Sequence, residues 1–280
     1  MVEAPRIRIL YDSLKFTTNK KIIDACGPSY KRIGINMIGY YIKEWWFVGK
    51  YIYLYLISKN KKPYVIRTHM IIYGKIIIND DKKYPNLTPF FILELDDGTT
   101  LTWYLSQITL LDPNCNNDMV KSNYTTCSSK KSITDSKRLQ IYDISSEFYD
   151  NDKHIEHLLL GLDKYRNDIF VDFLLDQEYF PGIGNISQQE ALYRCKILPM
   201  EKISNYNNRI LKKFINCFVK ELANVIGLLY RSYLDKLSDI PHNPVLQIYS
   251  KRYCPLGHKT ITKYLGFRDR KTTWCPICQK

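Results

Sequence analysis

Residues 174–199 read LLDQEYFPGIGNISQQEALYRCKILP and place a glycine-rich turn, Phe180 to Asn185, between two helix-like segments. Glycines let the backbone approach a phosphate closely, and a helix start presents unpaired amides and the positive end of the helix dipole. Asn185 lies just before the second helix, which is expected to begin at about Ile186, and its side chain can donate a hydrogen bond there. A simpler interpretation is a capping turn with Asn185 as the N-cap. Alone, the Gly-x-Gly-Asn pattern leaves both interpretations open.

Several segments around this turn carry apolar residues at three- and four-residue spacing, which predicts amphipathic helices. These segments are residues 155–165, 169–177, 185–197 and 207–237.

The first half of the chain, from Tyr40 to about Leu111, has a different pattern. It alternates turns with β-branched and aromatic runs, and Asp97-Gly98 divides the last run into two halves, which predicts antiparallel strands and hairpins. The runs are residues 45–57, 63–79 and 90–105. Residues 112–137 are rich in Asn, Ser, Thr and Lys, so a polar loop or linker is expected there, close to a domain boundary.

The end of the chain, from Tyr249, holds the most specific chemical pattern. Cys254 and His258 form one short-spaced pair, and after sixteen further residues Cys275 and Cys278 form a Cys-x-x-Cys pair. Two such pairs can close on one tetrahedral zinc ion, and four protein ligands leave no open position for substrate. We therefore predict one structural zinc and no catalytic cofactor. The alternative, free thiols beside a surface histidine, would leave a short tail without enough core to fold.

A basic β-hairpin is expected between the two ligand pairs. Two β-prone runs flank Gly266, and the hairpin carries Arg268, Arg270 and Lys271. From Tyr249 onward the chain has eight Lys or Arg residues against one acid, Asp269. A rigid basic hairpin suits phosphates or a nucleic-acid groove.

Composition agrees with a polyanionic partner. The net charge is +13, and Lys and Arg neutralise phosphates and release condensed counterions. No run of 18 apolar residues occurs and the start lacks the pattern of a secretion signal, so we expect an intracellular protein with no membrane partner. Eight cysteines are too few for a disulfide scaffold. Five are therefore expected to be free thiols, namely Cys26, Cys115, Cys127, Cys195 and Cys217.

Together these segments resemble a known family. Residues 174–199 resemble the helix-two-turn-helix signature of the Fpg/Nei DNA glycosylases, and are more similar to the endonuclease VIII-like branch. Residues 270–279, RKTTWCPICQ, look like that family's C-terminal zinc finger, in which an Arg and a Thr precede the third ligand. His258 departs from the four-cysteine pattern in a way that occurs in this branch.

The N-terminal half carries further matches. Val2-Glu3-Ala4-Pro5 stands where the family begins with Pro-Glu-Gly-Pro or Val-Glu-Gly-Pro. Gly49-Lys50-Tyr51 and the stretch from Thr68-His69 to Gly74 match strand motifs between the two ends. Several motifs in the family's order indicate the family more specifically than any single motif does. The chain, rich in Tyr, Asn, Ile and Lys, looks like a giant-virus member of the branch.

The resemblance implies an α+β multidomain protein in three parts. Residues 1–137 would form an N-terminal antiparallel β-sandwich with the catalytic residues, including the polar linker at about 112–137. Residues 138–248 would form the helix-two-turn-helix DNA-binding domain, and residues 249–280 the zinc-binding β-hairpin. We expect a monomer that binds damaged DNA as single strand, bubble or duplex.

The resemblance also implies the chemistry. After removal of Met1, the α-amine of Val2 would attack C1′ of the damaged nucleotide to form a Schiff base, and Glu3 would move protons. An α-amino group with a pKa of about 7.7–8.0 keeps a neutral fraction near pH 7. Lys50, His69, Asn185 and Arg270 would contact the DNA backbone, with Lys50 beside the lesion. Without the resemblance, Val2-Glu3 is more simply a disordered start and His69 a half-buried strand residue.

Two departures from the family bear on substrate choice. Arg6 follows Pro5 where many members have Glu, although the endonuclease VIII-like branch also lacks that Glu. The strand after Asp97-Gly98 lacks the Pro-Arg-Arg-Phe-Gly segment that fills the gap left by a flipped base, so Ile72 is the one expected survivor of that set. This predicts a preference for single-stranded or bubble DNA, with oxidised pyrimidines and hydantoins as substrates by analogy.

Two other classes of function fit parts of the sequence. A non-catalytic nucleic-acid-binding protein would keep the helical turn and zinc hairpin, and a zinc-ribbon partner in a transcription or replication assembly would need only the C-terminal cluster. Both predict no base excision. The expected activity is that of a bifunctional glycosylase and abasic-site lyase.

Overall fold

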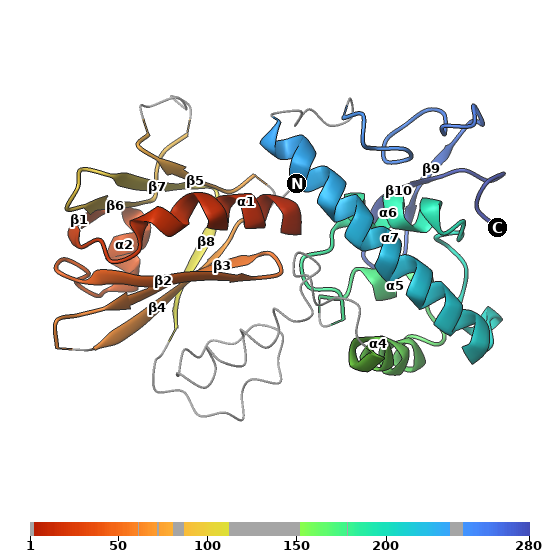
Figure 1. The fold of residues 1–280 in the computed structure, drawn as a ribbon, viewed down its shortest axis with the longest axis horizontal. Helices are drawn as coiled ribbons and strands as arrows, with labels where there is room; N and C mark the ends of the chain where they lie inside the picture. The colour runs from red at the N-terminus through yellow and green to blue at the C-terminus, as the bar shows by residue number, and fades with distance from the viewer. Residues whose placement is uncertain are drawn as a thin grey trace. The chain divides into compact units, whose positions relative to one another are not determined.

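The computed structural model describes residues 3–60, 62–71, 73–80, 87–111, 152–177, 179–235 and 243–280. The described residues form two compact units (Figure 1). The first runs from Ile7 to Leu111, and the second combines Glu3–Arg6 with the residues after the linker region. The expected linker at 112–137 lies outside the described residues, as do Val2 and Ile72.

The first unit contains two four-stranded antiparallel sheets, with strand orders β2-β3-β4-β8 and β1-β6-β7-β5. Figure 1 shows them as two layers with helix α1 running alongside. This confirms the expected antiparallel β architecture of the N-terminal half. The strands are β1 (Ile22–Cys26), β2 (Tyr41–Val48), β3 (Tyr51–Ile57), β4 (Pro63–His69), β5 (Lys75–Ile78), β6 (Phe91–Leu95), β7 (Thr100–Tyr104) and β8 (Gln107–Leu111).

One hydrophobic core lies between the two sheets. Residues from both sheets are fully or almost fully buried in it, including Trp45 of β2 and Trp103 of β7, whose rings stack with centroids 6.5 Å apart. The Trp103 indole N–H donates to the Thr68 hydroxyl of β4 at 3.1 Å, so this buried polar group has a partner across the core. The core between the sheets is therefore apolar, and this hydrogen bond is one polar link within it.

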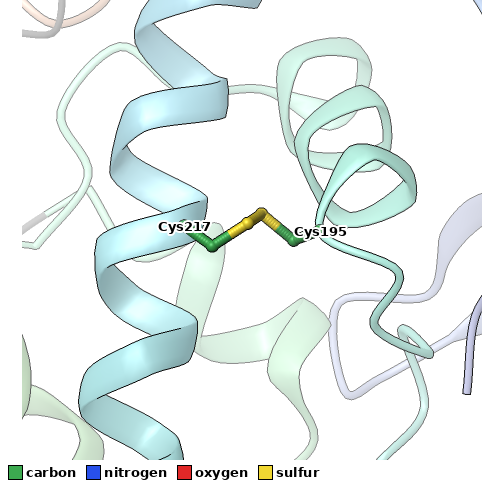
Figure 2. Close-up of a disulfide and its surroundings, with 2 residues drawn as sticks. All are labelled: Cys195 and Cys217. Atoms are coloured by element: carbon green, nitrogen blue, oxygen red, sulfur yellow. A yellow bond between two sulfur atoms is a disulfide. The ribbon is translucent and has the colours of Figure 1, made fainter.

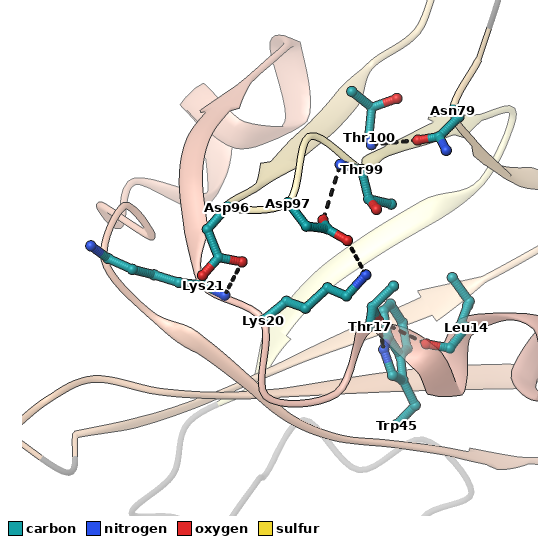
Figure 3. A network of polar contacts seen from close by, with 10 residues as sticks. All are labelled: Leu14, Thr17, Lys20, Lys21, Trp45, Asn79, Asp96, Asp97, Thr99 and Thr100. Carbon is teal, nitrogen blue, oxygen red and sulfur yellow. Dashed lines mark hydrogen bonds and ion pairs between the residues drawn. The ribbon is translucent and has the colours of Figure 1, made fainter.

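The β6–β7 hairpin forms at Asp97-Gly98, as the sequence predicts, and is fixed by a polar network (Figure 3). The ammonium group of Lys20 pairs with the Asp97 carboxylate, which also accepts from the Thr99 amide at 3.1 Å. The hydrogen bond from Lys20 is the main reason that the pKa of Asp97 falls to about 2. The turn is thus tied to the segment that leads into β1.

Helix α1 (Ala4–Leu14) begins directly after Glu3. Pro5 lies in its first turn, where proline is tolerated, and Ile7 and Leu14 are fully buried in the sandwich core. This spacing of seven residues was the available sequence signal. A second short helix, α2 (Pro28–Ile33), follows β1.

The second unit is mainly helical, which confirms the four predicted helices. Helix α7 buries Leu211, Phe218 and Val225 along one face, and its N-cap Asn207 accepts from the Ile210 amide at 3.0 Å. No helix among the described residues is long and apolar enough to cross a membrane. The helices are α4 (Asp152–Lys164), α5 (Phe170–Leu174), α6 (Asn185–Arg194) and α7 (Asn208–Leu234).

The predicted basic hairpin is present as strands β9 (Ile261–Leu265) and β10 (Arg270–Trp274). Its turn packs on the buried carboxylate of Asp172 in α5, which accepts from the Phe267 amide at 3.3 Å. Gly266 has a φ of 72°, and a Cβ there would lie 2.2 Å from an Asp172 oxygen. Only glycine satisfies both the backbone angle and this close approach.

The prediction of free thiols at Cys195 and Cys217 is wrong, because the two form a disulfide (Figure 2). Cys195 caps the end of α6 and Cys217 lies on α7, so the bridge joins neighbouring helices. Their separation of 22 residues follows no ligand spacing and gives no sequence signal. Cys26 is free and exposed, whereas Cys115 and Cys127 lie outside the described residues.

Replacing both cysteines, as Cys195→Ala with Cys217→Ala, is expected to lower the free energy of unfolding by about 3 kcal/mol, because the unfolded chain loses a cross-link. Urea denaturation of the variant and of a Cys26→Ala control would measure the change, and the control should match the wild type. Peptide mapping without reductant should recover the 195–217 pair. Separate, alkylatable peptides at both positions would contradict the assignment.

Candidate functional site

The carboxylate of Glu3 occupies the N-terminus of helix α6. Its oxygens accept hydrogen bonds from the Ile186 amide at 2.9 Å, the Ser187 amide at 3.2 Å and the Ser187 hydroxyl at 2.5 Å. Glu3 is only 3% exposed, so these donors replace the water that a carboxylate needs. A negative group at this position also complements the helix dipole. Glu3 is therefore a fixed, buried side chain.

Gly184 makes room for this carboxylate. A Cβ at position 184 would lie 2.2 Å from Glu3 Oε1, closer than any real contact. The Ala4 amide donates to the Gly182 carbonyl at 3.0 Å, which fixes the backbone beside it. The glycines of the predicted turn thus leave room for the chain's own N-terminal segment. The amides at the start of α6, which could have bound a phosphate, donate to Glu3 instead.

Asn185 is not the N-cap, as the simpler interpretation had it. Gly184 holds that position and Asn185 is the first residue of α6. Its side-chain amide donates to the Lys271 carbonyl at 2.7 Å, and Gln189 donates to the same carbonyl at 3.1 Å. Gln189 also accepts from the Thr273 amide at 2.8 Å. Helix α6 therefore holds the outer edge of β10 through two amide side chains.

Glu190 of α6 fixes the approach to the hairpin. Its buried carboxylate accepts from the amides of Gln247, Ile248 and Tyr249 at 2.8 to 2.9 Å. Burial raises the pKa of Glu190, and the backbone hydrogen bonds oppose that rise. One helix thus contacts the N-terminal segment, the hairpin and the segment before the metal ligands.

The four predicted metal ligands come together. The ligand atoms of Cys254, His258, Cys275 and Cys278 all lie within 4.8 Å of one another. The Cys254 and Cys278 sulfurs are 3.8 Å apart, close to the edge of about 3.8 Å that tetrahedral Zn–S bonds of about 2.3 Å require. His258 Nδ1 lies 3.2 Å from the Cys278 sulfur. The cluster can hold a metal, and its geometry fits zinc.

Arg270, also a predicted site residue, is exposed at the start of β10 opposite Leu265. It lies at the end of the hairpin away from the metal ligands, because Trp274 at the other end of β10 directly precedes Cys275. Its position leaves the guanidinium accessible to a partner.

The first unit brings Lys50 and His69 to one end of a sheet. Lys50 lies in the tight turn between β2 and β3, and Tyr51 directly after it pairs with His69 at the end of β4. The Tyr51 and His69 rings stack with centroids 4.6 Å apart. Burial lowers the pKa of His69, the charge of Lys50 lowers it further, and a hydrogen bond with Gln107 opposes both.

Three exposed apolar residues at the same end of this unit were missed by sequence reasoning. Register places the turn after His69 beside the turn after Tyr104, because β4 pairs with β8 and β5 with β7. Ile71 and Leu105 both have positive φ, 46° and 45°, which is strained for such side chains. Their exposed fractions are 42% and 48%, and that of Tyr73 is 70%.

Comparison with known proteins identifies the family. No family model matches the chain. The chain is 50% identical to Endonuclease 8-like L720 of Acanthamoeba polyphaga mimivirus over 279 residues, covering all of both proteins. The chain belongs to the Fpg/Nei family of DNA glycosylases. It falls in the endonuclease VIII-like branch, as the motifs predicted.

Solved structures support the family's fold. The crystal structure of a viral DNA glycosylase is 49% identical and superposes over all of both chains with a TM-score of 0.87. The Fpg glycosylase of Lactococcus lactis, bound to DNA with an abasic site, superposes over 99% of both chains with a TM-score of 0.71 at 16% identity. The latter shows the fold alone. The predicted α+β class with its C-terminal hairpin is confirmed.

The environment of His69 predicts a measurable titration. Its pKa should lie below the ordinary 6.5, so the ring should be mostly neutral at pH 7. Its contribution to stability is complete above pH 6.5 and is lost as the pH falls through the folded-state pKa. NMR titration should show this, with Lys50→Gln raising the pKa and the exposed control Lys31→Gln leaving it unchanged. A pKa above 6.5 would contradict the assignment.

Proposed function

We propose that this protein excises oxidised bases from DNA and then cleaves the abasic strand, using the α-amine of Val2 after removal of Met1. The observation that carries the proposal is the fixed carboxylate of Glu3, one residue from that amine and bonded to three donors of α6. A side chain that transfers protons to a bound sugar must be held in a fixed position relative to that sugar. Family membership supports the assignment, because glycosylase activity belongs to the family.

In the proposed reaction, the neutral Val2 amine attacks C1′, and the C1′–base bond breaks as the base leaves with a proton. Opening of the C1′–O4′ bond, with a proton added to O4′, then gives the Schiff base. Glu3 would protonate the sugar ring oxygen and later carry protons during strand cleavage. Ser187, which sequence reasoning missed, would act as a positioning residue, because its hydroxyl and amide both bind the Glu3 carboxylate. Lys50, His69, Asn185 and Arg270 are proposed contacts to the DNA backbone. Asn185 would do this while its amide also holds the Lys271 carbonyl.

Borohydride trapping tests the nucleophile. Incubating the protein with DNA that contains an abasic site or 5-hydroxyuracil should trap a covalent complex, because borohydride reduces the Schiff base. A retained Met1 or an N-terminal extension should abolish trapping. Peptide sequencing should locate the adduct on Val2. Failure to trap with a free Val2 terminus would favour the non-catalytic nucleic-acid-binding protein instead.

Two glycine substitutions test the position of Glu3 through the rate of base excision. Gly184→Ala places a methyl group 2.2 Å from Glu3 Oε1, so base excision should fall by about 100-fold. Gly227→Ala on α7 is the matched control, since a Cβ there meets nothing within 4 Å. Equal single-turnover rates for the two variants would remove Glu3 from the proposed chemistry.

We also propose oxidised pyrimidines and hydantoins as substrates, with a preference for single-stranded or bubble DNA. A base must be flipped out for C1′ to be reached, which costs less where the base is unpaired. Tyr73 and Leu105 offer exposed apolar surface to bases, but none of the described residues there offers the arginine of the missing family segment. Single-turnover excision of 5-hydroxyuracil should be faster in single-stranded or bubble DNA than in duplex. Equal rates, or faster duplex cleavage, would contradict this preference.

The metal is proposed to be one zinc ion held by Cys254, His258, Cys275 and Cys278, with a structural role. Chelation should unfold the hairpin and weaken DNA binding at least tenfold, while borohydride trapping at saturating DNA persists. Elemental analysis should find one zinc per chain, retained in a Cys26→Ser control and lost in Cys275→Ser. A metal-free protein with unchanged DNA affinity would contradict this role.

A further inference from the structure

A hollow of about 340 Å³ opens on the zinc module, which we define as residues 249–280. It lies where the segment before Cys254 meets the hairpin. Its lining residues are Ser250, Lys251, Arg252, Thr260, Thr262 and Lys271. Lys271 belongs to the basic hairpin, whereas Lys50, His69, Asn185 and Arg270 are not among the lining residues.

The lining has the chemistry of a phosphate site. Lys251, Arg252 and Lys271 bring three positive charges to one hollow, and its other three lining residues each carry a hydroxyl group. None of these six described residues is acidic. Cationic side chains are the usual partners of phosphate oxygens.

The backbone around the hollow is held by hydrogen bonds. The Lys271 carbonyl accepts from both Asn185 and Gln189, and the Thr260 hydroxyl donates to the Lys251 carbonyl at 2.5 Å. The hydroxyls of Thr262 and Thr273 are 3.0 Å apart across the hairpin. Glu190 fixes the segment immediately before Ser250. Binding a phosphate here would therefore require little ordering of the backbone.

The hollow is on the opposite face of the hairpin from Arg270. Arg270 pairs with Leu265 in the register, whereas Lys271 pairs with Tyr264, and successive residues of a strand point to opposite faces. Tyr264 is 64% exposed on the Lys271 face. An exposed ring beside a phosphate site offers a stacking surface for a base, which favours a nucleotide over a free anion.

We propose that this hollow binds a backbone phosphate of the DNA, at a site separate from Arg270, with Tyr264 beside the adjoining base. The inference rests on the proposed DNA substrate. The zinc module then contacts the strand through both faces of its hairpin.

The test uses the full protein and undamaged single-stranded DNA. The double variant Arg252→Gln with Lys271→Gln removes two charges from the hollow. The control Lys259→Gln with Lys280→Gln removes two exposed charges from the same module outside the hollow. Fluorescence anisotropy across a series of salt concentrations gives the affinity and its salt dependence.

The hollow variant should bind about tenfold more weakly, and its slope of log K against log salt should be shallower by about 0.7, the value for one lost phosphate contact on a single strand. The control should keep the wild-type slope. Tyr264→Ala should weaken binding with the slope unchanged, because a ring contributes no counterion release. Equal slopes for the hollow variant, the control and the wild type would overturn the proposal.

Two further arms separate the alternatives. Inorganic phosphate should compete only weakly, and tight phosphate binding with an unchanged DNA slope would make the hollow a free-anion site and overturn the proposal. Borohydride trapping at saturating abasic DNA should succeed for the hollow variant. If no covalent complex forms with the wild type, the proposed catalysis is wrong. The salt slopes measured on undamaged DNA would still show whether the hollow binds a phosphate.

Discussion

The first turn of α6 is the constraint on which the second unit depends. A helix start leaves backbone amides without partners, and a buried one must satisfy them from elsewhere. Here the carboxylate of Glu3 satisfies two of them. Because Gly184 has no side chain to obstruct it, the N-terminal segment can lie directly against the helix. The same requirement that completes the helix therefore positions the proposed proton-transfer group.

Helix α6 extends this arrangement to the metal-binding end. Asn185 and Gln189 hold the edge of β10, and Glu190 holds the segment that leads to Cys254. These polar side chains are almost fully buried, so an unpaired one would be costly. The metal cluster, the basic hairpin and Glu3 are all fixed to ten residues of one helix. The geometry of the zinc module follows from α6 as well as from the metal.

The sequence predicted those features that depend on local spacing. The alternation of apolar residues gave the strands and helices, and the Cys and His spacing gave the metal cluster, because both patterns reflect neighbours within a few positions. The contacts it missed join distant positions. Nothing near Glu3 or Ser187 indicates their hydrogen bond, and Cys195 and Cys217 carry no mark of their pairing. The interpretation of Asn185 as the N-cap is wrong because Gly184 holds that position and the Ile186 and Ser187 amides are bound by Glu3, far away along the chain.

The bond between Glu3 and Ile186 also has a consequence for synthesis. It joins residues 183 positions apart, so a growing chain cannot complete it until α6 has been made. Long loops close slowly and late, because their entropy must be lost before the contact forms. A fragment that begins after the linker would fold α6 without its carboxylate partner. A fragment that stops before α6 would carry Glu3 with no helix to receive it.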